Sequence, residues 1–450
     1  MSDPEFSIFF AKWGPTLVGG LFVFLFGACV GSFLNVLAWR LPTGQSVVTP
    51  PSRCPMCGHR LRWHENFPIL GWFLLRGRCG ACKVPISMQY PAVEVVVALL
   101  FTLAYIACFA PVDRSEGSFF ADSASIWWRI QGFGWSWPAF AVALMAIAGL
   151  VAMTIVDAKT MLIPPEIPTG VTIIAFVGWT VQGFMPESPS LRDQMPIPVV
   201  SWTVAFACVG TLIGLGVSRW LLATGRLRPS FSDWFEYADA HARSGAPADE
   251  PVPYPHARRE MVAELAFLLP GVAGAGVACV IAALLGYTSS ESVCQPMTLL
   301  GGSMLGWIVG GAIIWAVRIL GTLGFGREAM GLGDVHLQAA VGAAFGWKVA
   351  VLAFIVAVFL AVAWALVAFL LRRFSRLFHR EMPFGPHLAA AAILFVVARG
   401  PLIAAIDAFY GGLQSAVERL SGPMPEPEPR PDGNSGRSPP AELARPRDRR

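Results

Sequence analysis

The sequence predicts an all-α fold: a polytopic membrane helical bundle of about 8–10 transmembrane helices with a cytoplasmic four-cysteine zinc loop. Of the 450 residues, 55% are hydrophobic and only 14% are charged, whereas soluble domains carry about 25% charged residues. Apolar stretches recur from one end of the chain to the other, while four cysteines gather in a polar, basic loop near the N-terminus. The small net charge of +4, spread over loops, indicates no nucleic-acid partner.

Each apolar run of about 20 residues is expected to form one helix that crosses the lipid and satisfies its own backbone hydrogen bonds. No basic segment precedes the first run, so we expect an uncleaved first helix rather than a signal peptide. A run of about 12 residues at 335–346 is expected to form a partial or re-entrant helix. The other runs cover roughly 15–38, 91–110, 136–156, 168–184, 197–218, 262–286, 299–320, 348–371 and 387–409.

The distribution of Lys and Arg predicts the orientation of these helices, because basic loops stay in the cytoplasm. Loop 40–90 is rich in Lys and Arg and has one acidic residue, Glu65, so it should be cytoplasmic and the N-terminus outside. Alternation then puts Asp157, loop 219–261 and segment 321–334 on the cytoplasmic side. The last basic cluster also lies inside if 335–346 reverses the chain; it comprises Arg372, Arg373, Arg376 and Arg380.

These expectations divide the chain into six parts. The tail is rich in Pro, Gly and charge and cannot bury a core, so it should be disordered, and the linker should hold at most one short helix. The parts are a first transmembrane helix (1–40), a cytoplasmic zinc-binding loop (41–90), transmembrane helices with a first aspartate (91–218), a cytoplasmic linker loop (219–261), transmembrane helices with a second aspartate (262–410) and the tail (411–450).

The cysteine loop has the pattern C-x-x-C, 21 intervening residues, C-x-x-C. Four thiolates at this spacing suit tetrahedral zinc, and a closed four-cysteine site is structural because no position remains for water. Two redox pairs or unused thiols are the alternatives, and a reducing cytoplasm argues against disulfides. Nearby His59 and His64 are expected to be surface residues. The predicted ligands are Cys54, Cys57, Cys79 and Cys82.

Two aspartates stand out because ionisable residues are unfavourable in lipid and commonly functional there. Asp157 ends one apolar run, and Asp334 begins another within "GLGDVHLQAAVGAAFG". If both lie at the cytoplasmic face, they can share one proton, so that one acts as acid and the other as base, as in an aspartic protease. Gly331 and Gly333 allow a sharp turn or close approach of a substrate strand.

A purely structural role is the alternative for each aspartate. Asp334 is also well suited to be a helix N-cap, because Asp is a favoured capping residue. Asp157 in turn could be an interfacial cap before the turn at Pro164 and Pro165.

Five stretches in order resemble the bacterial type IV prepilin leader peptidases, which are GxGD membrane aspartic peptidases. The resemblance spans roughly 20–405 with one interruption, and the five together are far more specific than GxGD alone. The stretches are "GSFLNVLAWRLP" (31–42), the cysteine loop continuing into "ISMQYPAVE" (86–94), "DAKTMLIP" (157–164), "GLGDVHLQAAVGAAFG" (331–346) and "PFGPHLAAA" (383–391).

The resemblance implies that Asp157 and Asp334 are the catalytic pair of an inner-membrane enzyme. It also implies cleavage of a basic leader from prepilins or pseudopilins, on the cytoplasmic side, between a Gly and an aromatic residue. Many members methylate the new N-terminus with S-adenosylmethionine, which is therefore an implied cofactor. No stretch of the sequence independently indicates where it binds.

The chain departs from the family pattern in several places. His336 stands where a Lys is usual, which could change the charge beside the aspartates or the substrate preference. Pro165 takes the usual place of an acidic residue, with Glu166 one position later. An additional pair of helices flanks loop 219–261.

Three other functions remain open at this point. One is a cleavage-only GxGD intramembrane protease, although such enzymes are not expected to carry a four-cysteine loop. Another is a proton-coupled transporter, which neither inverted repeats nor mid-span charges support. The last is a non-enzymatic zinc-loop scaffold of a secretion complex.

Overall fold

The computed structural model is helical throughout, apart from two isolated β-bridges in the cysteine loop. It describes residues 4–111, 126–186, 191, 195–245, 252, 254–287, 295–371, 383–400, 402, 408 and 411. One compact unit covers Met1–Leu402, and the rest of the chain forms a separate unit. The basic cluster at 372–380 and the predicted disordered segment beyond 411 lie outside the described residues.

Ten apolar helices agree with the predicted bundle, and seven of them are long and apolar enough to cross a membrane. These seven are α1 (Pro4–Arg40), α3 (Gln89–Phe109), α4 (Ile126–Thr160), α6 (Trp202–Ala223), α8 (Ala257–Leu284), α9 (Gln295–Phe325) and α11 (Trp347–Leu371). The three shorter ones are α5 (Glu166–Gln182), α10 (Leu332–Phe345) and α12 (Gly385–Val397). Two polar or interfacial helices, α2 (Leu70–Leu74) and α7 (Trp234–Arg243), complete the described set, with a 3-10 turn at Leu41–Thr43.

Several helix limits differ from the apolar runs. Helix α6 begins at Trp202 rather than near 197, because two prolines in 195–201 keep that segment extended. Helix α8 begins at Ala257, inside the expected linker, so that Glu260 of that linker lies in the helix. The linker does contain one short helix, α7, as predicted.

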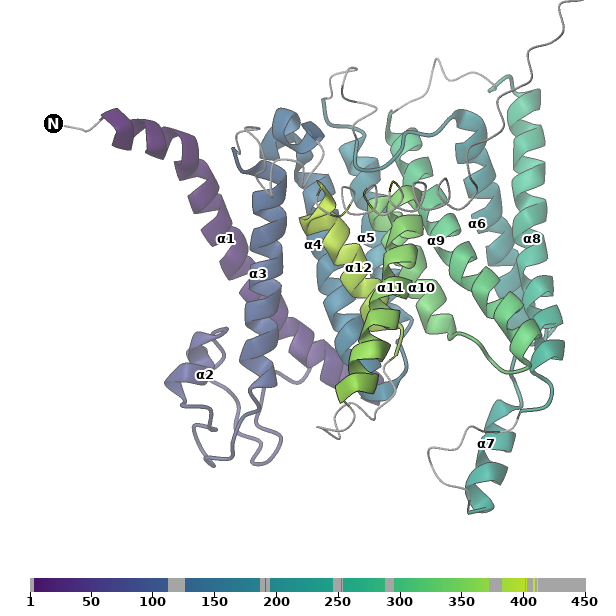
Figure 1. Cartoon of the computed structure of the whole chain (residues 1–450), viewed down its shortest axis with the longest axis horizontal. Helices are drawn as coiled ribbons and strands as arrows, with labels where there is room; N and C mark the ends of the chain where they lie inside the picture. The colour runs from purple at the N-terminus through teal and green to yellow at the C-terminus, as the bar shows by residue number, and fades with distance from the viewer. Residues whose placement is uncertain are drawn as a thin grey trace, which may run out of the picture. The chain divides into compact units, whose positions relative to one another are not determined.

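The cytoplasmic features predicted from charge lie at one end of the bundle (Figure 1). The chain passes down α1 into the cysteine loop, which holds α2, and α7 projects at the same end. Helix α4 also ends there, and the connection from α9 to α10 follows close by. Asp157 and Asp334 therefore share the end that carries the basic loop.

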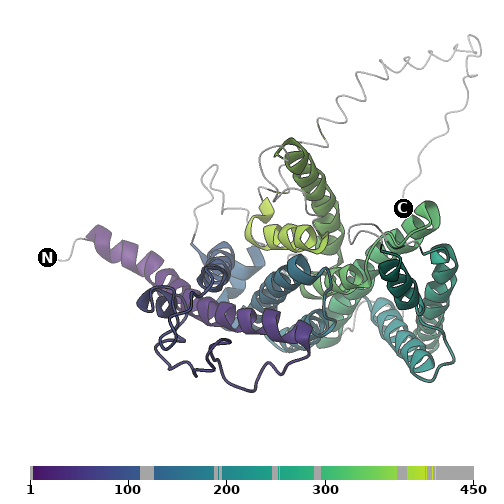
Figure 2. The same cartoon turned by 90° about the horizontal axis from the view of Figure 1, so that it is seen from below.

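The helices pack largely as sequence neighbours, with α10 at the centre. Helix α1 packs on α3 at one side, and α6 packs on α8 at the other (Figure 2). Helix α10 packs against α4, α5, α9, α11 and α12, and every residue from Leu337 to Phe345 is buried.

Helix α10 is too short to cross a bilayer, so its C-terminal end stays within the protein. At 14 residues it is about 21 Å long, against a hydrocarbon core of about 30 Å. Its last carbonyls have no partners inside the helix and need donors from elsewhere. Ser303 Oγ donates to Ala343 O at 2.6 Å, and Trp179 Nε1 donates to Ala344 O at 3.1 Å.

Glycines on both helices allow α9 and α10 to pack backbone to backbone. A Cβ on Gly306 would collide with the carbonyl oxygen of Gly342, and a Cβ on Gly342 would collide with that of Gly306. Gly310 meets the backbone of Gln338 in the same way. Such small-residue contacts are a common means of helix association in membranes.

We predict that Gly342→Val lowers the thermal unfolding midpoint of the detergent-solubilised protein, because the added side chain forces α9 and α10 apart. Overpacking of this kind costs about 1–3 kcal/mol. Gly276→Val is the matched control, because a Cβ on Gly276 in α8 meets open space. Equal midpoints for the two variants would contradict the packing argument.

Candidate functional site

Asp157 lies inside α4, three residues before the helix ends at Thr160. It is therefore not an interfacial cap before the prolines, which was one expectation from the sequence. The helix ends because Met161 takes a left-handed conformation with φ of 56°, and its N–H still donates to Asp157 O at 2.9 Å. The side chain of Asp157 is only 5% exposed.

Asp334 is the third residue of α10, and the N-cap is Gly331. The expectation that Asp334 itself is the N-cap was wrong. Its carboxylate instead turns back toward the backbone amide of Gly331, which is the role of the acidic residue in a capping box. The side chain is half-buried.

The fold brings the two aspartates together from positions 177 residues apart in the chain (334 − 157). Helices α4, α10 and α12 pack against one another, and the two carboxyl groups are close enough to interact electrostatically. Ile163 lies between the starts of α10 and α12, because Cβ atoms built on Gly333 and Gly385 would lie 3.0 and 3.4 Å from its side chain.

Gly385 completes this cluster and was missed by the residue-by-residue sequence analysis. A Cβ at this position would collide with Asp157 Oδ2, so only glycine lets the start of α12 approach the carboxylate. Its backbone amide faces Asp157. The signal in the sequence was the "PFGPH" turn, which was recognised only through the resemblance.

One oxygen of the pair has no partner. Asp157 Oδ2 is buried and accepts no hydrogen bond from any described residue. Buried carboxylate oxygens are normally satisfied, and a persistent exception commonly marks a catalytic group or the place of a water molecule. The arrangement therefore provides two interacting carboxyl groups and a free acceptor at one end of the bundle.

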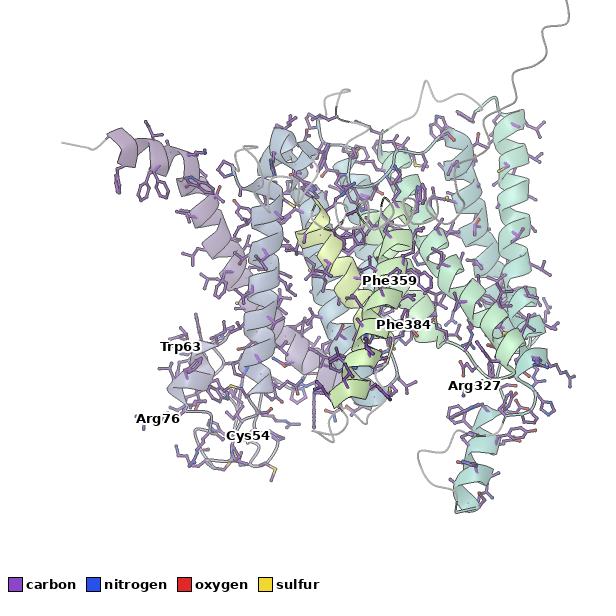
Figure 3. The ribbon with its side chains drawn as sticks, viewed as in Figure 1. Cys54, Trp63, Arg76, Arg327, Phe359 and Phe384 are labelled. Atoms are coloured by element: carbon purple, nitrogen blue, oxygen red, sulfur yellow. The ribbon has the colours of Figure 1, made fainter. Side chains whose placement is uncertain are left out.

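The four predicted cysteines form a second cluster, in the loop below α3 that also holds Trp63 and Arg76 (Figure 3). All four sulfurs lie within 4.8 Å of one another. Cys54 Sγ and Cys82 Sγ are 3.8 Å apart, and Cys57 Sγ and Cys79 Sγ are 4.0 Å apart. A disulfide needs about 2.05 Å, so these cross-knuckle contacts are not disulfides. The donor set and its spacing suit a bound metal ion.

The two C-x-x-C segments adopt the same local fold. Cys54 N donates to His59 O, and Cys79 N donates to Val84 O, both at 2.9 Å. Four residues after the first cysteine of each pair, the chain takes a positive φ, at Gly58 (71°) and at Lys83 (60°). Gly80, inside the second pair, is needed for close packing, because a Cβ there would collide with Glu65.

Glu65 holds the loop between the two segments together. Its Oε2 accepts the backbone N–H of Arg62 at 2.8 Å and faces His59 Nε2 at 3.2 Å. The Arg62 amide, followed by His59, lowers the pKa of Glu65 below its usual value. His59 thus contacts Glu65 and is half-buried rather than a free surface residue, whereas His64 is exposed as predicted.

Comparisons with known proteins give a domain match over the cysteine cluster and relatives over much of the chain. Residues 25–108 match the Bacterial Peptidase A24 N-terminal domain. The Prepilin leader peptidase/N-methyltransferase of Myxococcus xanthus is 40% identical over 257 residues, which are 48% of this chain and 67% of that protein. The chain belongs to the prepilin leader peptidase/N-methyltransferase family. The Aeromonas hydrophila relative of the same name is 25% identical over 393 residues, covering 82% of this chain and 87% of its own.

A further relative is the Type 4 prepilin-like proteins leader peptide-processing enzyme of Escherichia coli, which is 28% identical over 219 residues, 44% of this chain and 70% of its own. No solved structure matches the chain. The A24 domain match covers the second half of α1, the cysteine loop and α3, so the metal cluster belongs to the shared part of this family member. Like its relatives, the chain is a multi-pass membrane protein.

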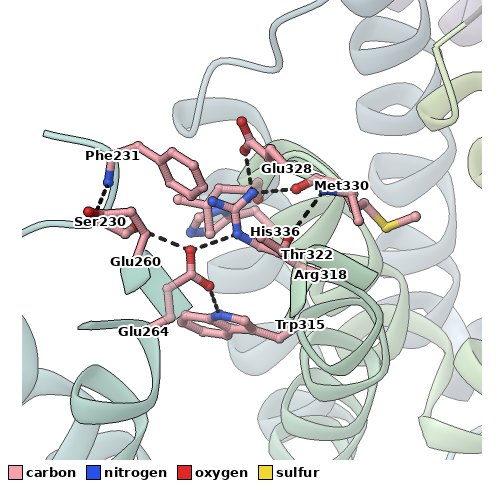
Figure 4. Close-up of polar contacts among 12 residues, drawn as sticks. Ser230, Phe231, Glu260, Glu264, Trp315, Arg318, Thr322, Glu328, Met330 and His336 are labelled. Atoms are coloured by element: carbon pink, nitrogen blue, oxygen red, sulfur yellow. Dashed lines mark hydrogen bonds and ion pairs between the residues drawn. The ribbon is translucent and has the colours of Figure 1, made fainter. Parts of the chain in front are cut away.

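A third group of buried polar residues lies beside the GxGD segment and was not singled out from the sequence (Figure 4). Arg318 on α9 is 1% exposed and Glu264 on α8 is 3% exposed, and Arg318 Nε donates to Glu264 Oε1 at 2.7 Å. Trp315 Nε1 donates to the other oxygen of Glu264 at 2.6 Å. The signal was an isolated charge of opposite sign near the cytoplasmic end of each of two apolar runs.

His336, which replaces the usual Lys, is exposed on α10, and its Nδ1 lies 2.8 Å from Leu332 O. The ring is thereby held against the preceding turn of its own helix. Its expected influence on the aspartates or on substrate preference stays a prediction.

We predict that the protein purified without chelator carries about one tightly bound metal ion per chain. Cys57→Ser should lose that ion and expose the loop to limited proteolysis, because three thiolates do not close a tetrahedral site. Elemental analysis together with peptide mapping measures both effects. Cys29→Ser is the control, since Cys29 is a free thiol on α1; metal retained by Cys57→Ser would refute the assignment.

Proposed function

We propose that this chain is a membrane aspartic endopeptidase that cleaves the leader peptide from type IV prepilins or pseudopilins. Cleavage takes place at a Gly–aromatic junction on the cytoplasmic side of the inner membrane, and the chain then methylates the new N-terminus. The observation that carries the proposal is the meeting of Asp157 and Asp334, with Oδ2 of Asp157 buried and unpartnered. The names of the relatives support both activities.

The two carboxyl groups share one proton, so the roles of acid and base belong to the pair. The ionised carboxylate takes a proton from water as the water oxygen attacks the scissile carbonyl carbon, and the protonated carboxyl gives its proton to the carbonyl oxygen. The carboxyl that took the proton from water then gives it to the leaving amine as the C–N bond breaks, and the other carboxylate takes back the proton of a hydroxyl of the intermediate, which restores the pair. Exposed Gly331 leaves room for the extended substrate backbone, while Gly333 allows contact with Ile163.

An apolar crevice beside Asp157 supports a membrane-embedded substrate. It has a volume of about 350 Å³ and is lined by α3, α4 and α12. Thr154 and Ile155 lead from the crevice to Asp157, and Pro386 follows Gly385 at its other side. We assign this crevice to the apolar segment of the prepilin, which would place the junction with its leader at the two aspartates.

The metal of the cysteine cluster is assigned as structural zinc. Zinc holds thiolate sulfurs at about 2.3 Å, so a tetrahedral site separates them by about 3.8 Å, close to the 3.8 and 4.0 Å observed. Four thiolates complete its coordination and leave it no catalytic position. Its contribution is to fold a loop that has too few apolar residues for a core.

Methylation needs a second site, and a cavity between the cysteine loop and the bases of α1 and α3 suits S-adenosylmethionine. Its volume is about 760 Å³. Aromatic faces for a purine are Trp39, Trp72 and Tyr90, and polar partners for the amino-acid part are Arg40 and Glu94. When bound, S-adenosylmethionine supplies an electrophilic methyl group. The chain's own residues would orient the new amine and exclude water from it.

The other functions open from the sequence have less support. A cleavage-only protease leaves the cavity beside the cysteine loop without a role, and the relatives carry the methyltransferase name. A non-enzymatic scaffold does not need a buried, unpartnered carboxylate oxygen beside a second aspartate.

We predict that Asp157→Asn and Asp334→Asn each lower cleavage of a co-reconstituted prepilin by at least about 10²-fold. Each substitution leaves only one carboxyl group, which cannot act as both the acid and the base. Mass spectrometry of the pilin N-terminus measures both leader loss and the added methyl group. Asp239→Asn on α7 is the control, because Asp239 is exposed and remote from the pair. Full cleavage by Asp157→Asn would overturn the dyad.

A second prediction separates the two activities. Trp39→Ala should weaken S-adenosylmethionine binding on the order of 10-fold, through loss of a stacking face, and should leave leader cleavage intact. Calorimetric titration gives the affinity, and N-terminal mass gives the methylation. Trp63→Ala is the matched control, since Trp63 is in the same loop but does not line the cavity. Unchanged binding by Trp39→Ala would exclude this cavity.

A further inference from the structure

The connection between α9 and α10 leads directly into the GxGD segment. It is held in place by one buried side chain, that of Arg318 on α9. The Arg318 guanidinium contacts three groups at once, namely the Glu264 carboxylate, the Glu328 carboxylate and the carbonyl oxygen of Met330 (Figure 4). A second anchor is Thr322, whose Oγ1 accepts the backbone N–H of Ala329 at 3.2 Å. Two residues on α9 thus fix the connection just before α10 begins.

The contact with Met330 connects Arg318 to Asp334 through the backbone. Met330 immediately precedes Gly331, and the Gly331 amide faces the Asp334 carboxylate. The position of that amide therefore depends on the peptide unit that Arg318 holds. Arginine suits this task because its planar fork presents several donors in a fixed geometry and remains charged when buried.

The stretch between α6 and α8 seals this arrangement from the cytoplasm. The Phe231 ring lies 5.2 Å from Arg318 Cζ, and Ser230 Oγ donates to Glu264 Oε1 at 3.2 Å. The backbone N–H of Phe231 donates to Glu260 Oε2 at 2.9 Å, which ties the segment to α8. The segment 228–233, which the sequence presented as a solvated linker, therefore covers a buried ion pair.

We propose that Arg318 is a positioning residue for Asp334, and that Phe231 maintains this function by excluding water from the Arg318–Glu264 pair. The inference rests on the proposed function. It assigns to the stretch between α6 and α8 a direct part in holding the peptidase site. Arg318 acts through the Met330 carbonyl and Gly331 and does not itself touch the substrate.

The experiment compares Arg318→Met, Arg318→Lys and the wild type in proteoliposomes with a purified prepilin. We expect Arg318→Met to lower kcat for cleavage on the order of 10- to 100-fold, the effect of a small misplacement of a catalytic group, with little change in KM. The pH profile of cleavage should also change, because the geometry of the shared proton is altered. Arg318→Lys should restore part of kcat and the wild-type profile.

Leu299→Ala distinguishes positioning from loss of stability. Leu299 is 1% exposed on the same helix, but lies near its opposite end. This variant should lower the unfolding midpoint without changing the pH profile. Methylation of a substrate that already lacks its leader should persist in Arg318→Met, which demonstrates a folded enzyme. If kcat and the profile of Arg318→Met match those of Leu299→Ala, Arg318 is merely structural.

Phe231→Ala provides an independent test should Arg318→Met fail to accumulate in the membrane. It leaves all ionic groups in place but admits water to the pair, so cleavage should become more sensitive to salt while methylation does not. Wild-type salt dependence would overturn the sealing role. Failure of the wild-type enzyme to cleave any prepilin would instead reject the proposed function, which keeps the two ideas separable.

Discussion

A buried charge in an apolar bundle must be compensated, and this constraint separates the structural charges of this protein from its reactive ones. Arg318, 1% exposed, is surrounded by two carboxylates and a carbonyl oxygen, and Glu264 receives hydrogen bonds from Arg318, Trp315 and Ser230. Asp157 is almost as buried, yet one of its oxygens has no hydrogen-bond partner among the described residues and its neighbour is another acid. The compensated Arg318–Glu264 pair thus serves as a structural support for the uncompensated pair of aspartates.

The short helix α10 makes this arrangement possible. Because it begins at the end of the bundle that carries the cysteine loop and stops inside the bundle, its first turn can carry Asp334 beside α4 while its last carbonyls are satisfied by Ser303 and Trp179. Glycines at the contact with α9 let it sit deep among five helices. A full-length helix would satisfy its own backbone without these contacts, and would have less need of partners that fix its depth and therefore the height of Asp334.

Much of this could be predicted from the sequence because hydrophobicity determines directly where the apolar helices form. Asp157 and Asp334 stand out as carboxylates at the ends of apolar runs, and the C-x-x-C spacing predicts the four-cysteine cluster. Contacts between distant segments were harder to predict. The approach of Gly385 to Asp157 depends on how α12 packs on α4, which no local pattern encodes. The pairing of Arg318 with Glu264 likewise depends on how α8 packs on α9, because each residue is only an isolated charge in its own apolar run.

The prediction of a solvated linker was wrong in part, again because of contacts between distant segments. Mixed charges in 219–261 predict a solvated loop, but one of its acids, Glu260, is 3% exposed, as is Glu264, which follows it in the apolar run. They are buried because each has a donor, the first from the Phe231 backbone and the second from Arg318. Composition alone does not distinguish an exposed acid from a paired one; the difference lies in a partner on another helix. A charged segment flanking membrane helices can therefore belong to the core, and here it lies against the residue that holds the connection to Asp334.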